Sequence, residues 1–300
     1  MWSILGVLSA ILLGLNDILK KSSLRGNYVL PVLFMACVTG ALVFLPMLLL
    51  SHFLPSFSEV KLLYVPAINW SSHLLILLKS ALVASSWILA YFAFKHLPIT
   101  IASPIRASGP LWTLAGALLI FGEKMNILQW TGVVLTIGFY YLFSLAGKKE
   151  GINFRENKWV LYIVLATILG SISALYDKYL VLKIGRMAVQ AWYSQYLVLV
   201  MLPVLLVSFL NGQSSFFPKR WAWTIPLIGL TLSVADFLYF YAIAMPGALI
   251  AIISTLRRSS VLVSFLGGAL LFRDRNVTRK LLILLGILAG IVLIVYGSQR

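Results

Sequence analysis

Long apolar stretches separated by short polar links run through this sequence, and they restrict its fold more than any other feature. The hydrocarbon core of a bilayer is about 30 Å thick, and a helix needs roughly 20 mostly apolar residues to cross it. The stretches are continuous and lack the alternating pattern of membrane β-barrel strands. We therefore predict an all-α integral membrane protein of ten transmembrane helices. The predicted spans are residues 4–19, 29–50, 73–94, 99–121, 128–145, 159–182, 188–210, 223–244, 248–272 and 281–296.

The composition agrees with a protein that has lipid as its solvent. Hydrophobic residues make up 61% of the 300, and the mean hydropathy is +0.99. A soluble domain could not bury so much apolar surface, because single hydrophobic cores stop growing as chains lengthen. The net charge is +16, but most Lys and Arg residues lie in short loops between the apolar stretches. Basic residues in such loops set orientation in a membrane, so we expect contact with membrane lipid and no nucleic-acid partner.

The basic loops are distributed unevenly between the two sides of the membrane. Those after the first, third, fifth, seventh and ninth stretches hold most of the Lys and Arg residues. The positive-inside rule places these loops in the cytoplasm and both chain termini outside it. We expect a multi-pass protein of the cell membrane, the inner membrane in a bacterium.

Residues for metal or catalytic chemistry are sparse. Cys37 is the single cysteine and lies inside an apolar stretch, which leaves no disulfide framework or cysteine metal site. The histidines His52, His73 and His96 are scattered, with no HExxH motif and no paired-carboxylate pattern. The sequence therefore predicts no metal, no cofactor and no enzymatic activity.

An internal repeat divides the chain into two halves. Residues 91–98 (YFAFKHLP) are echoed by residues 239–246 (YFYAIAMP), and residues 116–124 (GALLIFGEK) by residues 268–275 (GALLFRDR). Arg106 precedes Glu123 by 17 positions, and Arg257 precedes Asp274 by the same 17. Apolar helices can resemble each other by chance, but two landmarks in the same order favour duplication.

The repeat predicts a division into residues 1–147 and 159–300, each of five helices, joined by a polar linker at residues 148–158. Because five is odd, the second half must enter the membrane upside down. Two inverted five-helix repeats around a midplane site form an architecture that is used for alternating access.

These landmarks give the chain a resemblance to the EamA-type, ten-helix members of the drug/metabolite transporter superfamily. They are the helix starts at Pro98 and Pro246 and the segment from Gly116 to Glu123 with its echo ending at Asp274. The resemblance covers nearly the whole chain and implies a secondary carrier made of one chain. We expect a monomer or a weak homodimer. It also implies a central cavity lined by helices one to four and six to nine, with helices five and ten peripheral. The second copy departs from the pattern by having Arg273 where the first has Gly122.

Three arginines inside the apolar stretches are the leading candidates for substrate binding. Arg106 and Arg257 each lie about 4–6 Å from the middle of their helices, and Arg258 follows on a neighbouring face. Ionisable groups at this depth cost several kcal/mol and normally face a cavity or a partner. Arginine offers a fork of donors that fits a carboxylate or a phosphate, so a substrate with a negative group, or a zwitterion with one, is predicted. The alternatives are pairing with Asp236 or bonding of carbonyls freed by nearby prolines.

Two aspartates are candidates for substrate binding or for ion coupling. Asp236 lies in the middle of its helix and could bind an ammonium group, relay a proton or neutralise an arginine. Asp17 is the second coupling candidate, although a local pair with Lys20 or Lys21 explains it more simply. Lys79 lies about two turns into its helix and is expected to snorkel to the nearer interface.

Aromatic and small polar side chains could complete a binding pocket. Aromatic rings can hold a planar or cationic group, and hydroxyls can donate hydrogen bonds. The alternative is that the rings face lipid and the hydroxyls bond their own helix. The candidates are Ser86, Trp87, Trp192, Tyr193, Tyr239 and Ser254.

The leading functional prediction is a secondary transporter that moves a small polar metabolite by alternating access. A flippase for an anionic lipid or a lipid-linked sugar would share the fold, with the arginines escorting the phosphate. A membrane-embedded enzyme lacks a catalytic constellation in this sequence, and a channel lacks a filter-like loop.

Overall fold

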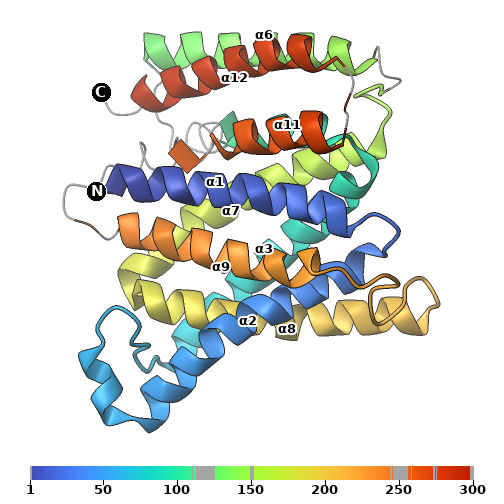
Figure 1. Cartoon of the computed structure of the whole chain (residues 1–300). Helices are drawn as coiled ribbons and strands as arrows, with labels where there is room; N and C mark the ends of the chain where they lie inside the picture. The colour runs from blue at the N-terminus through green and yellow to red at the C-terminus, as the bar shows by residue number, and fades with distance from the viewer. Residues whose placement is uncertain are drawn as a thin grey trace.

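A computed structural model describes residues 2–109, 111–112, 126–148, 152–243, 245, 256–257, 259–272, 274 and 276–297. Within these residues the regular structure is entirely helical (Figure 1). The predicted all-α fold is confirmed for this part of the chain. The helices are α1 (Trp2–Ser23), α2 (Val29–Phe53), the 3₁₀ turn η1 (Pro55–Glu59), α3 (Trp70–His96), α4 (Ile99–Ala107), α6 (Ile127–Lys148), α7 (Lys158–Ile184), α8 (Arg186–Leu210), α9 (Thr224–Ile243), α11 (Ser260–Leu271) and α12 (Val277–Gly297).

Six of the described helices are long and apolar enough to cross a bilayer: α2, α3, α7, α8, α9 and α12. They lie at six of the predicted spans, and α1 and α6 lie at two others. The chain is therefore a multi-pass membrane protein. The predicted spans 99–121 and 248–272 are seen only in part, as α4 and α11, because residues 113–125 and 246–255 lie outside the described residues.

Local chemistry explains where several helices begin. Asn69 caps α3 by accepting a hydrogen bond from the Ser72 N–H at 2.9 Å, and Asn157 caps α7 in the same way with Trp159. A single residue, Gly185, separates α7 from α8. Its φ of +96° lies in the region that glycine adopts without a steric cost. The two helices can therefore form a tight antiparallel hairpin.

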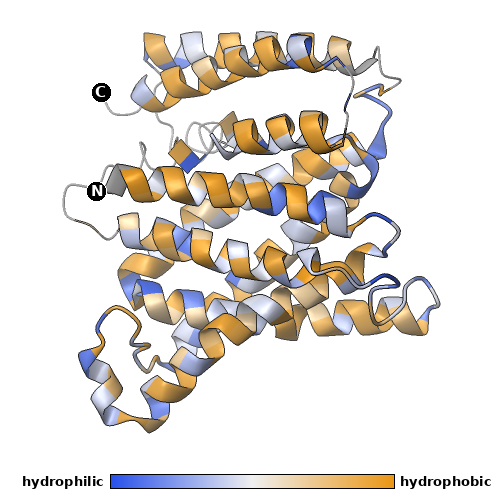
Figure 2. Cartoon of the chain, viewed as in Figure 1, coloured by the Kyte–Doolittle hydropathy of each residue, from blue (hydrophilic) through white to orange (hydrophobic). Residues whose placement is uncertain are grey.

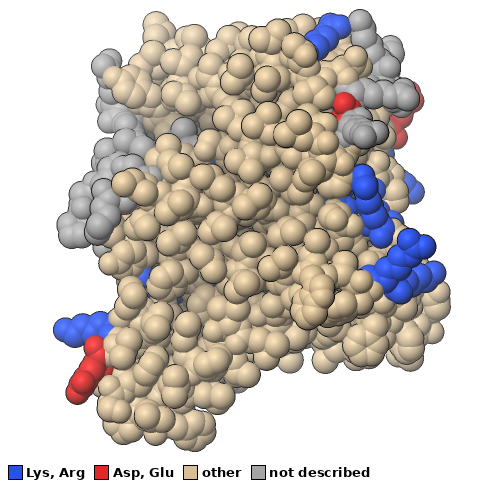
Figure 3. Space-filling model, in the orientation of Figure 1, with Lys and Arg blue, Asp and Glu red and all other residues tan. Residues whose placement is uncertain are grey.

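Hydrophobic residues predominate along the helices of the bundle (Figure 2). Large side chains such as Ile127, Leu182 and Leu270 have more than three quarters of their surface exposed. A soluble protein rarely exposes continuous apolar areas of this kind, whereas lipid tails solvate them. In Figure 3 the Lys and Arg side chains gather mainly at one end of the helices, where α1 and α8 end and α9 begins. We call this the basic end; α1 begins and α12 ends at the opposite end (Figure 1).

The helices pack in pairs that join the two halves of the sequence. In the interior α1 packs against α9 and α11, α3 against α7 and α8, and α2 against α8 and α9. Helix α4 packs against α7 and α11. Helices α6 and α12 pack mainly against each other, and Figure 1 shows this pair along one side of the bundle. The interior therefore contains helices from both halves in alternation.

Glycines allow the closest of these helix contacts. A Cβ atom on Gly132 of α6 would lie 2.7 Å from the Gly290 carbonyl oxygen of α12. Gly267 of α11 would place a Cβ 2.1 Å from Ile18 Cδ1 of α1. Small residues let membrane helices gain packing energy where there is no hydrophobic force between them.

The Gly132 contact predicts a difference between two substitutions in one helix. Gly132→Ala should destabilise the protein by about 1–3 kcal/mol, because the backbone of α12 must move away. Gly138→Ala is the matched control, since a Cβ there meets nothing within 4 Å. Thermal unfolding of the purified protein in detergent measures both. Equal melting temperatures for the two variants would contradict the close α6–α12 contact.

Candidate functional site

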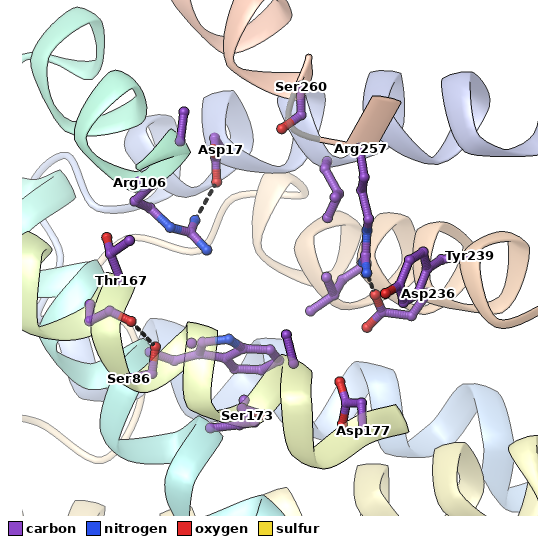
Figure 4. Close-up of a pocket in the computed structure, with 18 of the residues that line it drawn as sticks. Asp17, Ser86, Arg106, Thr167, Ser173, Asp177, Asp236, Tyr239, Arg257 and Ser260 are labelled. Atoms are coloured by element: carbon purple, nitrogen blue, oxygen red, sulfur yellow. Dashed lines mark hydrogen bonds and ion pairs between the residues drawn. The ribbon is translucent and has the colours of Figure 1, made fainter. Parts of the chain in front are cut away.

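A cavity of about 250 Å³ lies between the helices of the two halves (Figure 4). Residues of α1, α3, α4, α7, α8, α9 and α11 line it. Seven charged side chains are among the described lining residues, although the surrounding helices are mostly apolar. They form two groups on opposite sides of the cavity. The Asp17 cluster contains Asp17, Lys20 and Arg106, and the Asp236 cluster contains Lys79, Asp177, Asp236 and Arg257.

Helix direction decides how deep each cluster lies. Asp17 is six residues before the end of α1, and Arg106 is seven residues after the start of α4; both helix ends are at the basic end. Asp236 is seven residues before the end of α9, at the opposite end. At 1.5 Å per residue, each cluster is about 10 Å inside the helix ends on its own side. The two clusters therefore approach the middle of the bundle from opposite ends.

In the Asp17 cluster two cations share one carboxylate oxygen. Lys20 Nζ lies 3.2 Å and Arg106 Nη1 lies 3.1 Å from Asp17 Oδ1. The predicted local pair between Asp17 and Lys20 is confirmed. Asp17 and Lys20 are almost fully buried, whereas the Arg106 side chain keeps 34% of its surface exposed. Arg106 is the member of this cluster that a solute can reach most easily.

The Asp236 cluster consists of two separate ion pairs. Arg257 donates to Asp236, which is one of the alternatives that the sequence left open, and Lys79 donates to Asp177. Each cation also lies over an aromatic ring, Arg257 at 4.1 Å from the centre of Tyr239 and Lys79 at 4.5 Å from the centre of Tyr193. These rings favour the cations electrostatically in a region with little water.

Two buried polar atoms at the cavity have no hydrogen-bond partner among the described residues. They are Ser103 Oγ and Arg257 Nε. A polar group buried without a partner costs free energy, so such an atom is available to a molecule inside the cavity. Ser103 is 2% exposed and stands three residues before Arg106, on the same face of α4.

Most of the predicted site residues come together in this cavity. Its lining includes the predicted residues Asp17, Ser86, Trp87, Arg106, Tyr193, Asp236, Tyr239 and Arg257. Ser86 donates its hydroxyl to the Ala166 carbonyl oxygen at 2.7 Å, so that proton is already engaged. Trp192 lies elsewhere, edge-on to His73 with ring centres 4.6 Å apart. Arg258 and Ser254 lie outside the described residues.

Sequence reasoning missed several members of the cavity. Lys79 does not snorkel as expected: it is 3% exposed and pairs with Asp177 of the other half. Ser103 was not singled out, and Lys20 was given only a local role. The sequence signal that could have identified the charged members is the energetic cost of an ionisable group in an apolar helix. That cost predicts a partner for Lys79 but does not say which residue it is.

Side-chain hydrogen bonds tie the helices together at the basic end. Lys21 Nζ donates to the carbonyl oxygens of Phe94 and Leu97, at 2.7 and 2.6 Å, where α3 ends and α4 begins. Asp274 accepts hydrogen bonds from the Thr100 N–H at 3.1 Å and from the Thr100 hydroxyl at 2.8 Å. The acidic landmark of the second half thus holds the start of α4, a helix of the first half. A carboxylate is favoured there by the unpaired N–H groups of a helix start.

Comparison with known proteins shows a similarity to one family and to one known fold. Residues 1–145 match the model of the EamA-like transporter family, and the predicted resemblance is confirmed. No curated protein matches the chain. One crystal structure, described only as "protein", has a similar fold, with a TM-score of 0.61 and 15% sequence identity. The match covers 97% of this chain and 98% of the other. At that identity the two are alike in fold alone.

The Lys79–Asp177 pair predicts a non-additive effect on stability. Lys79→Met or Asp177→Asn alone should destabilise the protein by about 3–5 kcal/mol, because each leaves a buried charge without its partner. The double variant should recover a large part of that loss. Thermal unfolding in detergent measures the stability of the two single variants and the double variant. Lys183→Met, at an exposed position of α7, is the control. Additive losses would show that the two side chains are not paired.

Proposed function

We propose that this chain, an EamA-type member of the drug/metabolite transporter superfamily, moves a small polar metabolite with an anionic group across the membrane by alternating access. The observation that carries the proposal is the group of seven charged side chains around one cavity between the two halves. Charged side chains inside a membrane protein mark pathways for polar substrates or ions, because they are otherwise costly. The family is one of transporters and not of enzymes.

The size of the cavity favours a small solute. Its 250 Å³ lies below the range of about 300–1,000 Å³ that is usual for drug-sized ligands. The volume corresponds to about eight water molecules at 30 Å³ each. A metabolite of a few carbon atoms fits this space, whereas a lipid-linked sugar would need an open groove towards the lipid. The flippase is therefore the second candidate.

The packing of the helices supports an inverted repeat. If each helix of the first half corresponds to the one five spans later, α1, α2, α3, α4 and α6 correspond to α7, α8, α9, α11 and α12. If each helix is replaced by its counterpart, the α1–α9 contact corresponds to an α7–α3 contact. In the same way, the α1–α11 contact corresponds to an α7–α4 contact. All four contacts are present. Arg106 then corresponds to Arg257, and each delivers a guanidinium group to the cavity from its own side.

The bonds at the basic end support alternating access. Such a carrier must close one side of its cavity while the other admits substrate. The bonds of Lys21 and Asp274 hold α1, α3 and α4 together at that end, and they are hydrogen bonds between side chains and helix termini. Contacts of this kind can be broken without disturbing the apolar core. We propose that these hydrogen bonds break when the cavity opens towards the basic end.

The two arginines give the direct test of an anion-binding cavity. Uptake of labelled metabolites by proteoliposomes, together with acceleration of uptake by unlabelled substrate on the other side, identifies a carrier and its cargo. Arg106→Ala and Arg257→Ala should each lower uptake about tenfold or more, because a charge-assisted hydrogen bond contributes about 1.5–3 kcal/mol. The control is Arg155→Ala in the linker between α6 and α7, which should transport normally. Unchanged binding and uptake in both cavity variants would remove the anion proposal.

Asp236 and Asp17 are the proposed coupling residues, because each is a carboxylate on the cavity wall. If a proton is transported with the substrate, an imposed pH gradient should drive accumulation in the wild-type protein. Asp236→Asn should keep exchange of substrate but lose accumulation driven by the gradient, since the amide cannot take up the proton. Asp17→Asn is measured in parallel. Coupling that survives in one variant excludes that residue from the proton path.

A further inference from the structure

The two clusters of the cavity differ in charge. In the Asp236 cluster each carboxylate has its own cation, Arg257 for Asp236 and Lys79 for Asp177. In the Asp17 cluster Lys20 and Arg106 share the single carboxylate of Asp17. Among the described lining residues, one positive charge is therefore left without an equivalent negative charge, and it lies on the Asp17 side. A charge without a counter-charge is costly inside a membrane protein, and a bound anion removes that cost.

We propose that the Asp17 cluster is the subsite for the carboxylate of a small monocarboxylic acid, held by Arg106, Lys20 and Ser103. The proposal deepens the proposed function and rests on it for the view that the ligand is a transported solute. It makes Lys20 the residue that determines specificity for a single negative charge. Without the Lys20 ammonium group, Asp17 and Arg106 form a neutral pair like the two pairs across the cavity.

The charge of the cluster selects among anions. One carboxylate neutralises a surplus of one positive charge. A phosphate monoester carries about −1.5 to −2 at pH 7 and would leave an excess of negative charge in the membrane. A zwitterion would bring an ammonium group that needs a carboxylate of its own. Asp177 and Asp236 are already paired with cations, so the opposite side of the cavity offers an ammonium group no free partner.

The hydroxyl of Ser103 is a second and independent sign of a ligand at this place. It lines the cavity, is 2% exposed and has no partner among the described residues. Elsewhere in the cavity the hydroxyls of Ser86 and Thr167 are bonded to backbone carbonyls, at 2.7 and 2.6 Å. A hydroxyl beside a guanidinium group can donate to the second oxygen of a carboxylate. The carboxylate would then have donors from both α1 and α4.

The arrangement also explains why Arg106 is less buried than its neighbours. Arg106 keeps 34% of its side-chain surface exposed, against about a tenth for Asp17 and Lys20. An arginine has five N–H donors, and the contact with Asp17 Oδ1 uses one nitrogen. The remaining face of the guanidinium group is available for a bidentate contact with a carboxylate. Lys20 supplies the charge that makes this contact favourable.

The experiment compares matched ligands on the purified full-length protein. Lactate, pyruvate, 3-hydroxybutyrate and benzoate are the monocarboxylates. Their amides are the neutral analogues, alanine and 3-aminobutyrate are zwitterions, and inorganic phosphate is the multivalent anion. Thermal shift and titration calorimetry measure binding. At least one monocarboxylate should stabilise the protein and bind more tightly than its amide, than the zwitterions and than phosphate. A set in which no monocarboxylate binds, or in which a zwitterion or phosphate binds better, overturns the proposal.

Variants then locate the binding. Lys20→Gln should weaken the monocarboxylate about tenfold or more and bring its affinity close to that of the amide, whereas Lys20→Arg should keep the preference. Ser103→Ala should weaken the same ligand several-fold. Asp17→Asn raises the surplus to two positive charges, so affinity for phosphate should increase. Lys183→Gln on the exposed face of α7 is the control. If the ratio of carboxylate affinity to amide affinity is unchanged in Lys20→Gln, the subsite is contradicted. This ratio does not depend on the fraction of folded protein, so a folding defect in the variant would not alter it.

The outcomes separate this subsite from the proposed function. Binding of a monocarboxylate that depends on Lys20, without uptake of that ligand by proteoliposomes, would leave the subsite standing and reject transport. Uptake of a zwitterionic solute, without Lys20-dependent binding of any monocarboxylate, would reject the subsite and leave transport standing.

Discussion

Ion pairing between helices that are distant in sequence is the interaction on which this cavity depends. A charge in the middle of a bilayer is costly, and each charged side chain described here at the cavity meets an opposite charge from another helix or from the next turn. The Lys79–Asp177 pair joins α3 to α7, and the Arg106–Asp17 pair joins α4 to α1. These pairs hold the walls of the cavity in place and also give it the polar lining that a solute needs.

Close packing supplies the rigid frame in which such pairs can form. Glycine contacts such as that of Gly132 with Gly290 bring backbones together where lipid provides no hydrophobic force. Polar bonds at the basic end, from Lys21 and Asp274, add contacts that are easier to break than packed apolar surfaces. The proposed alternating access would require packed helix pairs of this kind, joined at one end by bonds that can break. One arginine reaches the cavity from each side, Arg106 from the first half of the sequence and Arg257 from the second.

Much of the candidate site was visible in the sequence because of one rule. Ionisable groups within apolar stretches must face a partner or a cavity, and this rule selected Arg106, Arg257 and Asp236. It could not assign partners, since Lys79 and Asp177 are 98 residues apart and belong to different halves. Trp192 shows the converse limit. Its ring chemistry suited a pocket, yet helix rotation turned it towards His73.

The sequence by itself determined the all-helical membrane fold, because the length and apolar content of each stretch leave a bilayer-crossing helix as the stable solution. Landmarks at the starts and ends of helices also indicated the resemblance to a transporter family, and residues 1–145 match the model of that family. Only the tertiary structure decided the charge balance around the cavity, which depends on distances between side chains of non-adjacent helices. Neither hydropathy nor spacing records that Lys20 and Arg106 share one carboxylate while Lys79 and Arg257 each have their own. Helix rotation and register set those distances, and both are fixed by packing against neighbouring helices.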